Sequence, residues 1–134
     1  MIEQKQNNLP LKKILIIEDE GDICLLLNLI LKEDDIELDH VKSLELAKEY
    51  LSKNSPQVVL LDNRLPDGLG VDFIGFIRQN YPAIKICMIS GYSITAKDIA
   101  LANGADIYLE KPFSKEQVNQ AVQTLMAQTE SENV

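Results

Sequence analysis

Residues 58–68 read VVLLDNRLPDG, and this stretch decides the fold. The apolar run Val58–Leu61 predicts a strand covered on both faces, because it lacks the alternation of a half-exposed strand. The run leads into a charged residue, Asp62, and Pro66 and Gly68 then predict a turn. Ligands of open α/β sheets bind beyond the carboxyl ends of the strands, so the residues that follow each strand are the first candidates for a site.

The rest of the chain alternates between short apolar segments and longer segments with helical periodicity. Four further strands are predicted from segments rich in Ile, Val and Leu, namely Ile14–Ile17, Ile36–Val41, Ile84–Ile89 and Ile107–Leu109. Apolar residues spaced three or four apart predict helices around Ile23–Ile30, Leu44–Leu51, Val71–Ile77, Ile94–Asn103 and Val118–Leu125. Ser114 and Gln117 form a capping-box pattern before the last helix. Alternation of this kind implies a doubly wound α/β fold, with a five-stranded parallel sheet and five helices.

Length and composition limit the classes of function. The chain has 134 residues, of which 46% are hydrophobic, as expected for one domain with a substantial core. We expect that domain to cover residues 12–127, with flexible tails at 1–11 and 128–134. A net charge of −8 argues against direct binding of nucleic acid. The sequence has no membrane-spanning run and no secretory signal at its start, so a cytoplasmic location is expected, with Cys24 and Cys87 as buried reduced thiols.

Polar side chains follow four of the five predicted strands. The first strand is followed by acidic residues, the third by a carboxylate, the fourth by a hydroxyl and the fifth by an amine: Glu18, Asp19, Glu20, Asp62, Ser90 and Lys111. If the first and third strands are neighbours, Glu18, Asp19 and Asp62 converge. Like charges raise each other's pKa, so such a cluster is sensible around a divalent cation, and oxygen ligands of this kind suit Mg²⁺. The amine and the hydroxyl would bind the oxygens of a phosphoryl group.

Four motifs, IIEDE, LLDNRLPDG, MISGY and YLEKPF, fall in this order at the strand ends. Together they resemble the receiver domain of two-component response regulators, over roughly residues 12–127. The resemblance implies a flavodoxin-like fold with strand order 2-1-3-4-5, similar to that of single-domain, CheY-like regulators. It also implies roles for individual residues. Asp62 is the implied phosphoacceptor, and Lys111 and Ser90 take part in the reaction with it. The implied Mg²⁺ ligands are Glu18, Asp19, Asp62 and the backbone carbonyl of Arg64. The implied switch residues are Ser90 and Tyr108, and the peptide between Lys111 and Pro112 is expected to be cis.

The activity implied by the resemblance is that of a signalling phosphoacceptor and not of an enzyme with a separate substrate. Such a domain takes a phosphoryl group from a histidine kinase or a histidine phosphotransfer protein, and it catalyses its own phosphorylation and dephosphorylation. The implied output is a change on the face formed by helix 4, strand 5 and helix 5, which binds a downstream protein or a second copy of the chain.

Several alternatives remain open. A pseudo-receiver would keep the fold as a phosphorylation-independent binding module. A flavodoxin-like cofactor carrier would need a hydroxyl- or glycine-rich loop where Glu18–Glu20 stand, and an aspartyl-nucleophile phosphatase would need a second acid where Arg64 stands. Tyr108 is alternatively an ordinary half-buried residue of a strand. His40 is interpreted as a surface residue away from the site.

The first predicted helix carries more apolar residues than one inward stripe requires. Its stripe is predicted from Ile23, Leu26, Leu27 and Ile30, and the additional residues are Cys24, Leu25, Leu29 and Leu31. Either these residues are buried between neighbouring helices, or some of them form an exposed docking surface for the kinase.

Overall fold

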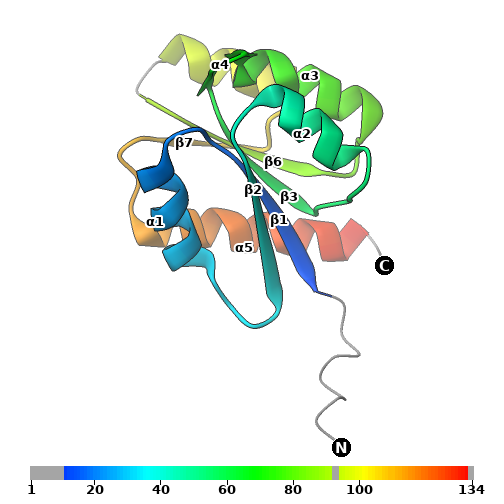
Figure 1. Cartoon of the computed structure of the whole chain (residues 1–134), viewed down its shortest axis with the longest axis vertical. Coiled ribbons are helices and arrows are strands. Elements are labelled where there is room, and N and C mark those ends of the chain that lie inside the picture. The colour runs from blue at the N-terminus through cyan, green and yellow to red at the C-terminus, as the bar shows by residue number, and fades with distance from the viewer. Residues whose placement is uncertain (1–10, 92–93, 133–134) are drawn as a thin grey trace, which may run out of the picture.

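A parallel five-stranded sheet lies between two layers of helices (Figure 1). The computed structural model describes residues 11–91 and 94–132. The predicted N-terminal tail lies almost entirely outside these residues. The sheet strands are β1 (Lys12–Ile17), β2 (Ile36–Val41), β3 (Val58–Asp62), β6 (Lys85–Ser90) and β7 (Ile107–Glu110). The helices are α1 (Gly21–Leu31), α2 (Leu44–Leu51), α3 (Gly70–Asn80), α4 (Ile94–Asn103) and α5 (Lys115–Glu132).

The strand order is β2-β1-β3-β6-β7, and all four pairings are parallel. This order is the predicted 2-1-3-4-5 arrangement, counted over the five sheet strands. In the register, Ile17 on β1 lies opposite Leu61 on β3, and Asp62 lies opposite Ile89 on β6. The carboxyl ends of the central strands therefore meet at one edge of the sheet.

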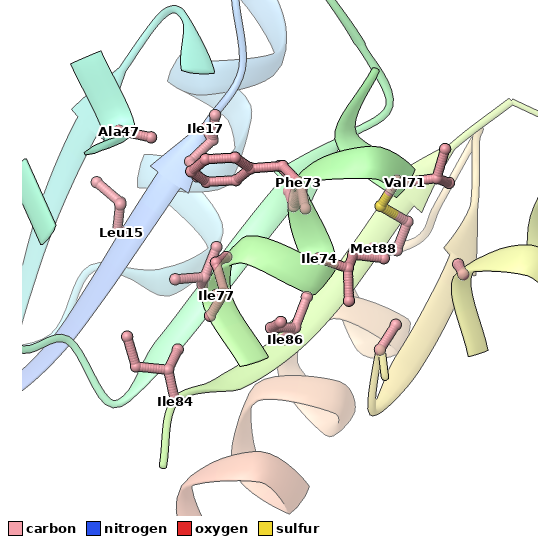
Figure 2. Packing of buried hydrophobic residues seen from close by; sticks show 14 of the residues in the cluster. Leu15, Ile17, Ala47, Val71, Phe73, Ile74, Ile77, Ile84, Ile86 and Met88 are labelled. Carbon is pink, nitrogen blue, oxygen red and sulfur yellow. The ribbon is translucent and has the colours of Figure 1, made fainter. Parts of the chain in front are cut away.

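Alternate residues of the central strands pack into two separate cores. On β3, Val59 and Leu61 face α2, α3 and α4, whereas Val58 and Leu60 face α1 and α5. Both sides of β3 are completely buried, which explains why its sequence is apolar without alternation. Figure 2 shows the first of these cores, in which residues of β1, α2, α3 and β6 pack together. The labelled residues are Leu15, Ile17, Ala47, Val71, Phe73, Ile74, Ile77, Ile84, Ile86 and Met88.

The ends of the helices follow the expected capping chemistry, with one difference in length. Ser114 and Gln117 form the predicted capping box, since the Gln117 side chain accepts the Ser114 N–H and the Ser114 hydroxyl accepts the Gln117 N–H. Gly104 ends α4 with a φ of 116°, which favours glycine. The last helix continues to Glu132, so the tail predicted from residue 128 is helical over its first five residues.

A short antiparallel hairpin after β3 was not predicted from the sequence. It consists of β4 (Arg64–Leu65) and β5 (Gly68–Leu69), with Pro66 and Asp67 at its turn. Strands of two residues are too short for a hydrophobic period, and the turn residues alone predicted only a change of direction. The hairpin leads directly from the end of β3 into α3.

The helices differ in how deeply they enter the core. The third helix buries Val71, Phe73, Ile74 and Ile77. In α4, by contrast, Ala100 is the one buried residue among the side chains that the structure describes there, and Leu101 is exposed. The described helices include none that is both long enough and apolar enough to span a membrane.

Candidate functional site

Three carboxylates converge at the carboxyl edge of the sheet, as the sequence predicted. Glu18 and Asp19 follow β1, Asp62 ends β3, and one oxygen of each lies within 4.8 Å of the others. Glu18 and Asp62 are buried, with 2% and 6% of their surface exposed, whereas Asp19 is exposed. Burying two carboxylates so close together is costly unless cations or hydrogen-bond donors compensate.

Lys111 supplies part of that compensation. Its Nζ lies 3.0 Å from Asp62 Oδ1, 3.5 Å from Glu18 Oε1 and 3.6 Å from Glu20 Oε1. The lysine is held at this edge by its own backbone, because the Lys111 N–H donates to the Ser90 carbonyl at 2.7 Å. Its peptide bond to Pro112 is cis, as the resemblance implied. The contact to Glu20 was not predicted, although the sequence placed that residue in the same acidic run.

The electrostatic balance of the site is uneven. Burial raises the pKa of Glu18 to about 7, with a further contribution from the Asp62 charge, and Lys111 and the Glu20 N–H oppose these effects. Burial alone would lower the pKa of Lys111. Its hydrogen bond to Asp62 and the charges of Asp62, Glu18 and Glu20 outweigh that effect and raise its pKa. One ammonium thus faces three acidic side chains, and the site has an excess of negative charge.

The buried polar side chains in the described part of the chain all lie at this edge. They are Glu18, Asp62 and Ser90. Each of the three was predicted as a site residue from its place after a strand. Buried polar groups are expensive to keep, so their gathering at one edge is a mark of function and not of general packing.

Close packing and two hydrogen bonds at the start of α3 fix the end of β3, where Asp62 lies. The start of α3 lies so close to the end of β3 that a Cβ on Gly70 would stand 2.3 Å from the Asp62 carbonyl oxygen. Asn63 accepts the Gly70 N–H through its carbonyl at 2.7 Å and the Val71 N–H through its side chain at 3.0 Å. Asn63 and Gly70 are therefore supporting residues that the sequence reasoning missed, although a glycine at a strand–helix junction is a signal for close approach.

The predicted switch residues lie on neighbouring strands. Ser90 ends β6, and Tyr108 is on β7, where its side chain is half-buried against the core shared with α3. The Tyr108 hydroxyl donates to the carbonyl of Gly91, the residue after Ser90, at 3.1 Å. The structure thus connects the two residues through one backbone position. It also agrees with the simpler interpretation of Tyr108 as a half-buried strand residue.

His40 corrects the expectation of a surface residue away from the site. It is half-buried on β2, and its Nε2 lies 2.8 Å from the Glu18 carbonyl, to which an N–H at that position would donate. The Cys24 thiol donates to the same carbonyl at 3.4 Å. The β1–β2 pairing brings His40 beside the end of β1. No sequence pattern predicts such a contact. Burial raises the pKa of Cys24 to about 11, so its thiol stays protonated.

The donor set at this edge fits a hard divalent cation. All three converging side chains offer carboxylate oxygens, which Mg²⁺ prefers, and the cluster is not closed because Asp19 is exposed. Arg64 lies on the hairpin two residues beyond Asp62 and its side chain is exposed. The role of the Arg64 backbone carbonyl as a metal ligand stays a prediction.

The first helix presents an apolar surface to solvent. Cys24 and Leu31 are buried, as one of the two alternatives expected, but Leu25 and Leu29 are 61% and 70% exposed. Leu26 is also exposed, so its place in the predicted inward stripe is wrong. The inward face of α1 is formed by Cys24, Leu27 and Leu31, and Ile23 and Ile30 of the predicted stripe are partly buried against the same core.

Comparisons with known proteins identify the family to which the chain is similar. The family model described as "Response regulator receiver domain" matches residues 14–123. The response regulator protein PilR of Pseudomonas aeruginosa is 33% identical over 116 residues, which cover 86% of this chain and 26% of PilR. The KDP operon transcriptional regulatory protein KdpE of Escherichia coli is 36% identical over 101 residues, covering 75% of this chain and 44% of KdpE. The chain thus spans less than half the length of these two curated relatives.

Solved structures show the same likeness. The beryllofluoride-activated NtrC4 receiver domain dimer has a TM-score of 0.84 and 33% identity, covering 89% of this chain and 99% of that one. A CheY-like response regulator receiver domain protein from Methanospirillum hungatei has a TM-score of 0.85 and 25% identity, covering 91% of this chain and 98% of that one.

Proposed function

Because this chain belongs to the response regulator receiver domain family of two-component signalling, we propose that it accepts a phosphoryl group on Asp62 and uses it to switch a protein-binding face. The observation that carries the proposal is the gathering of the buried polar side chains Glu18, Asp62 and Ser90 around Lys111. A pseudo-receiver has no need of that costly arrangement.

In the proposed reaction, a phosphohistidine of a histidine kinase or phosphotransfer protein presents its phosphoryl group to Asp62. One oxygen, Oδ1, is held by Lys111 at 3.0 Å, so we expect Oδ2 to attack the phosphorus. The new P–O bond forms as the P–N bond of the phosphohistidine breaks, and the histidine leaves with the electron pair and takes up a proton. Water later hydrolyses the acyl phosphate and restores the carboxylate.

The side chains around Asp62 would orient the phosphoryl group and neutralise its negative charge. Glu18 and Asp19, with the carbonyl of Arg64, would hold Mg²⁺, which when bound orients the phosphoryl group and offsets its negative charge. Lys111 stays protonated and binds a phosphoryl oxygen as a point charge. The hydroxyl of Ser90, which ends the neighbouring strand β6, would donate to another oxygen of the product. These groups are positioned in advance by the strand ends, which is how proteins lower the barrier of phosphoryl transfer.

The exposed leucines of α1 fit the partner that this reaction requires. Leu25 and Leu29 lie on the helix that begins directly after the acidic turn, within reach of a protein that delivers its phosphohistidine to Asp62. Exposed apolar patches next to a site are typical of protein interfaces. We propose this surface as part of the kinase or phosphotransfer interface.

The proposed output face comprises α4, β7 and α5. It includes the half-buried Tyr108 at the sheet edge and the exposed Ile99 and Leu101 of α4. A downstream protein or a second copy of the chain would bind there, and the NtrC4 relative is described as a dimer in its beryllofluoride-activated form. We place the reaction in the cytoplasm, a reducing compartment that suits the free buried thiols Cys24 and Cys87.

The first experiment replaces Asp62 with Asn, which removes the nucleophile but keeps the size of the side chain. We expect the parent protein to be labelled by a small-molecule phosphodonor only when Mg²⁺ is present, and the variant to lose that labelling. Asp22→Asn, at an exposed position of α1, controls for loss of one negative charge. Labelling that persists in Asp62→Asn would contradict the assignment.

Uptake of beryllofluoride, a mimic of the acyl phosphate, separates this function from the pseudo-receiver alternative. We expect Mg²⁺-dependent chemical-shift changes at the amides of Asp62, Ser90 and Lys111. A folded parent protein whose spectrum is unaffected by Mg²⁺ and beryllofluoride together would favour the pseudo-receiver.

A further inference from the structure

The hairpin after β3 is joined to a helix that is distant in sequence. Asp67, at the tip of the hairpin, accepts the Leu44 N–H through Oδ1 and the Glu45 N–H through Oδ2, both at 2.9 Å. Leu44 and Glu45 are the first two residues of α2, whose leading N–H groups have no partner within the helix. The remaining cap is local, since the Ser43 hydroxyl accepts the Leu46 N–H at 3.1 Å.

The contact between the Asp67 carboxylate and the start of α2 is strong for an exposed position. A carboxylate at a helix N-terminus is favoured by the helix dipole, and here both oxygens are bonded. The hydrogen bonds from Leu44 and Glu45 lower the pKa of Asp67, so the group stays charged near neutral pH. A second contact reinforces it, because the Leu44 side chain packs directly against Gly68, 3.0 Å from where a Cβ would stand. The hairpin is therefore held against the start of α2.

The hairpin also carries Arg64, two residues after Asp62. A side-chain ligand adjusts to a metal by rotating about its own bonds, but a backbone carbonyl moves only with its loop. The inner end of this loop is fixed by the bond from the Gly70 N–H to the Asn63 carbonyl. Its outer end is fixed by Asp67.

We propose that Asp67 is a positioning residue for the metal site: by binding the first two N–H groups of α2, it fixes the β4–β5 hairpin and with it the carbonyl of Arg64. This inference rests on the proposed function, because it needs Arg64 to be a metal ligand. It also makes α2 a structural support of the site, although this helix contributes no residue to the acidic cluster.

The test compares three variants of the full chain for Mg²⁺ affinity and for hydrogen exchange of the hairpin amides. Asp67→Ala removes the link between hairpin and helix. Ser43→Ala removes a cap from the same helix but leaves the hairpin bonded. Asp72 lines, together with Asp67, a groove between α2, the hairpin and α3. Asp72→Ala therefore removes a nearby negative charge but leaves the hydrogen bonds of Asp67 and Ser43 in place.

We expect Asp67→Ala to weaken Mg²⁺ binding by about tenfold, the lower end of the range for groups that support metal ligands. It should also speed hydrogen exchange at Leu65 and Leu69. Ser43→Ala should lower the melting temperature with little change in Mg²⁺ affinity or in hydrogen exchange of the hairpin. Asp72→Ala should leave hydrogen exchange of the hairpin unchanged.

Two outcomes overturn the inference, and they are distinguishable. If the parent binds Mg²⁺ and Asp67→Ala binds it equally well, or no more weakly than Ser43→Ala or Asp72→Ala, then Asp67 does not position the site and the proposed function stands. If the parent itself binds no Mg²⁺, the proposed function fails and this inference fails with it.

Discussion

Glu18 is an ionisable carboxyl group that is deeply buried, and this makes its titration a test of the site. Its pKa is raised from 4.5 to about 7, first by burial and then by Asp62. Between these values the folded protein retains a proton that the unfolded chain releases. The folded state therefore binds more protons, and the free energy of unfolding falls as pH rises from about 4.5 to about 7.

We predict two consequences for the metal-free and the metal-bound protein. Without Mg²⁺, this component of the pH dependence should disappear in Glu18→Gln and persist in Glu20→Gln, as measured by chemical denaturation across that pH interval. With Mg²⁺, affinity should rise with pH and level off above about 7, because the metal needs the ionised carboxylate. A Mg²⁺ affinity that is flat between pH values of about 5 and 8 would contradict the raised pKa.

The contrast between Glu18 and His40 shows which residue positions can be predicted from the sequence and which contacts cannot. Glu18, Asp62 and Lys111 were predictable because each follows a strand, and parallel strands end at a common edge. The contact of His40 with the Glu18 carbonyl was not predictable, since it depends on the direction and reach of one side chain from a neighbouring strand. The bond from Asp67 to α2 was hidden for the same reason.

The start of α3 lies in close contact with the end of β3. Gly70 opens the helix against the Asp62 carbonyl, whereas a methyl group added at Gly75, in the middle of the same helix, would meet nothing within 4 Å. The two glycines therefore serve different purposes. Only at Gly70 does the absence of a side chain determine where the helix starts.

We predict opposite effects for alanine at these two positions. Gly70→Ala should push α3 away from Asp62, lower stability by about 1–3 kcal/mol and slow phosphorylation. Gly75→Ala should raise stability by about 0.5–1 kcal/mol, because alanine is favoured over glycine inside a helix. Thermal denaturation and labelling rates of both variants give the comparison. Equal stability of the two variants would show that the close approach at Gly70 is relieved without cost.

At the scale of elements, the sequence predicted the strands and helices that are long enough to show an apolar pattern. The five sheet strands and five helices are found where apolar patterns indicated them, with shifts at the ends. The inward stripe of α1 was wrong at Leu26, since a helix this rich in leucine offers more than one apolar face. The β4–β5 hairpin was missed because two-residue strands carry no period.

Across the whole domain, the proposed switch connects the carboxyl edge to the face of α4, β7 and α5. Ser90 and Tyr108 meet through the backbone of Gly91, which accepts the Tyr108 hydroxyl. If Ser90 moves toward a phosphoryl group, the Gly91 carbonyl moves with it and the bond to Tyr108 is disturbed. A bound group shifts such an equilibrium only by its different affinity for the two states.

We predict that Ser90→Ala keeps phosphorylation of Asp62 but loses most of the response at Tyr108, because the hydroxyl that senses the phosphoryl oxygens is gone. Ser90→Thr keeps a hydroxyl and should retain the response. NMR signals of the Tyr108 ring, recorded with and without beryllofluoride and Mg²⁺, measure both variants. A full Tyr108 response in Ser90→Ala would show that the signal takes another route.

The small buried surface of α4 has a consequence for the evolution of such domains. Of the side chains described in this helix, Ala100 alone is buried, so most of its surface makes little contribution to the core. Substitutions there cost little stability, in contrast to those in β3, which is buried on both sides. Under the proposed function, mutations can therefore accumulate on α4 and change which protein binds the output face, while selection on the acidic edge keeps phosphoryl transfer to Asp62 constant. A gene duplicate of this domain could acquire a new target without passing through an unstable or inactive intermediate.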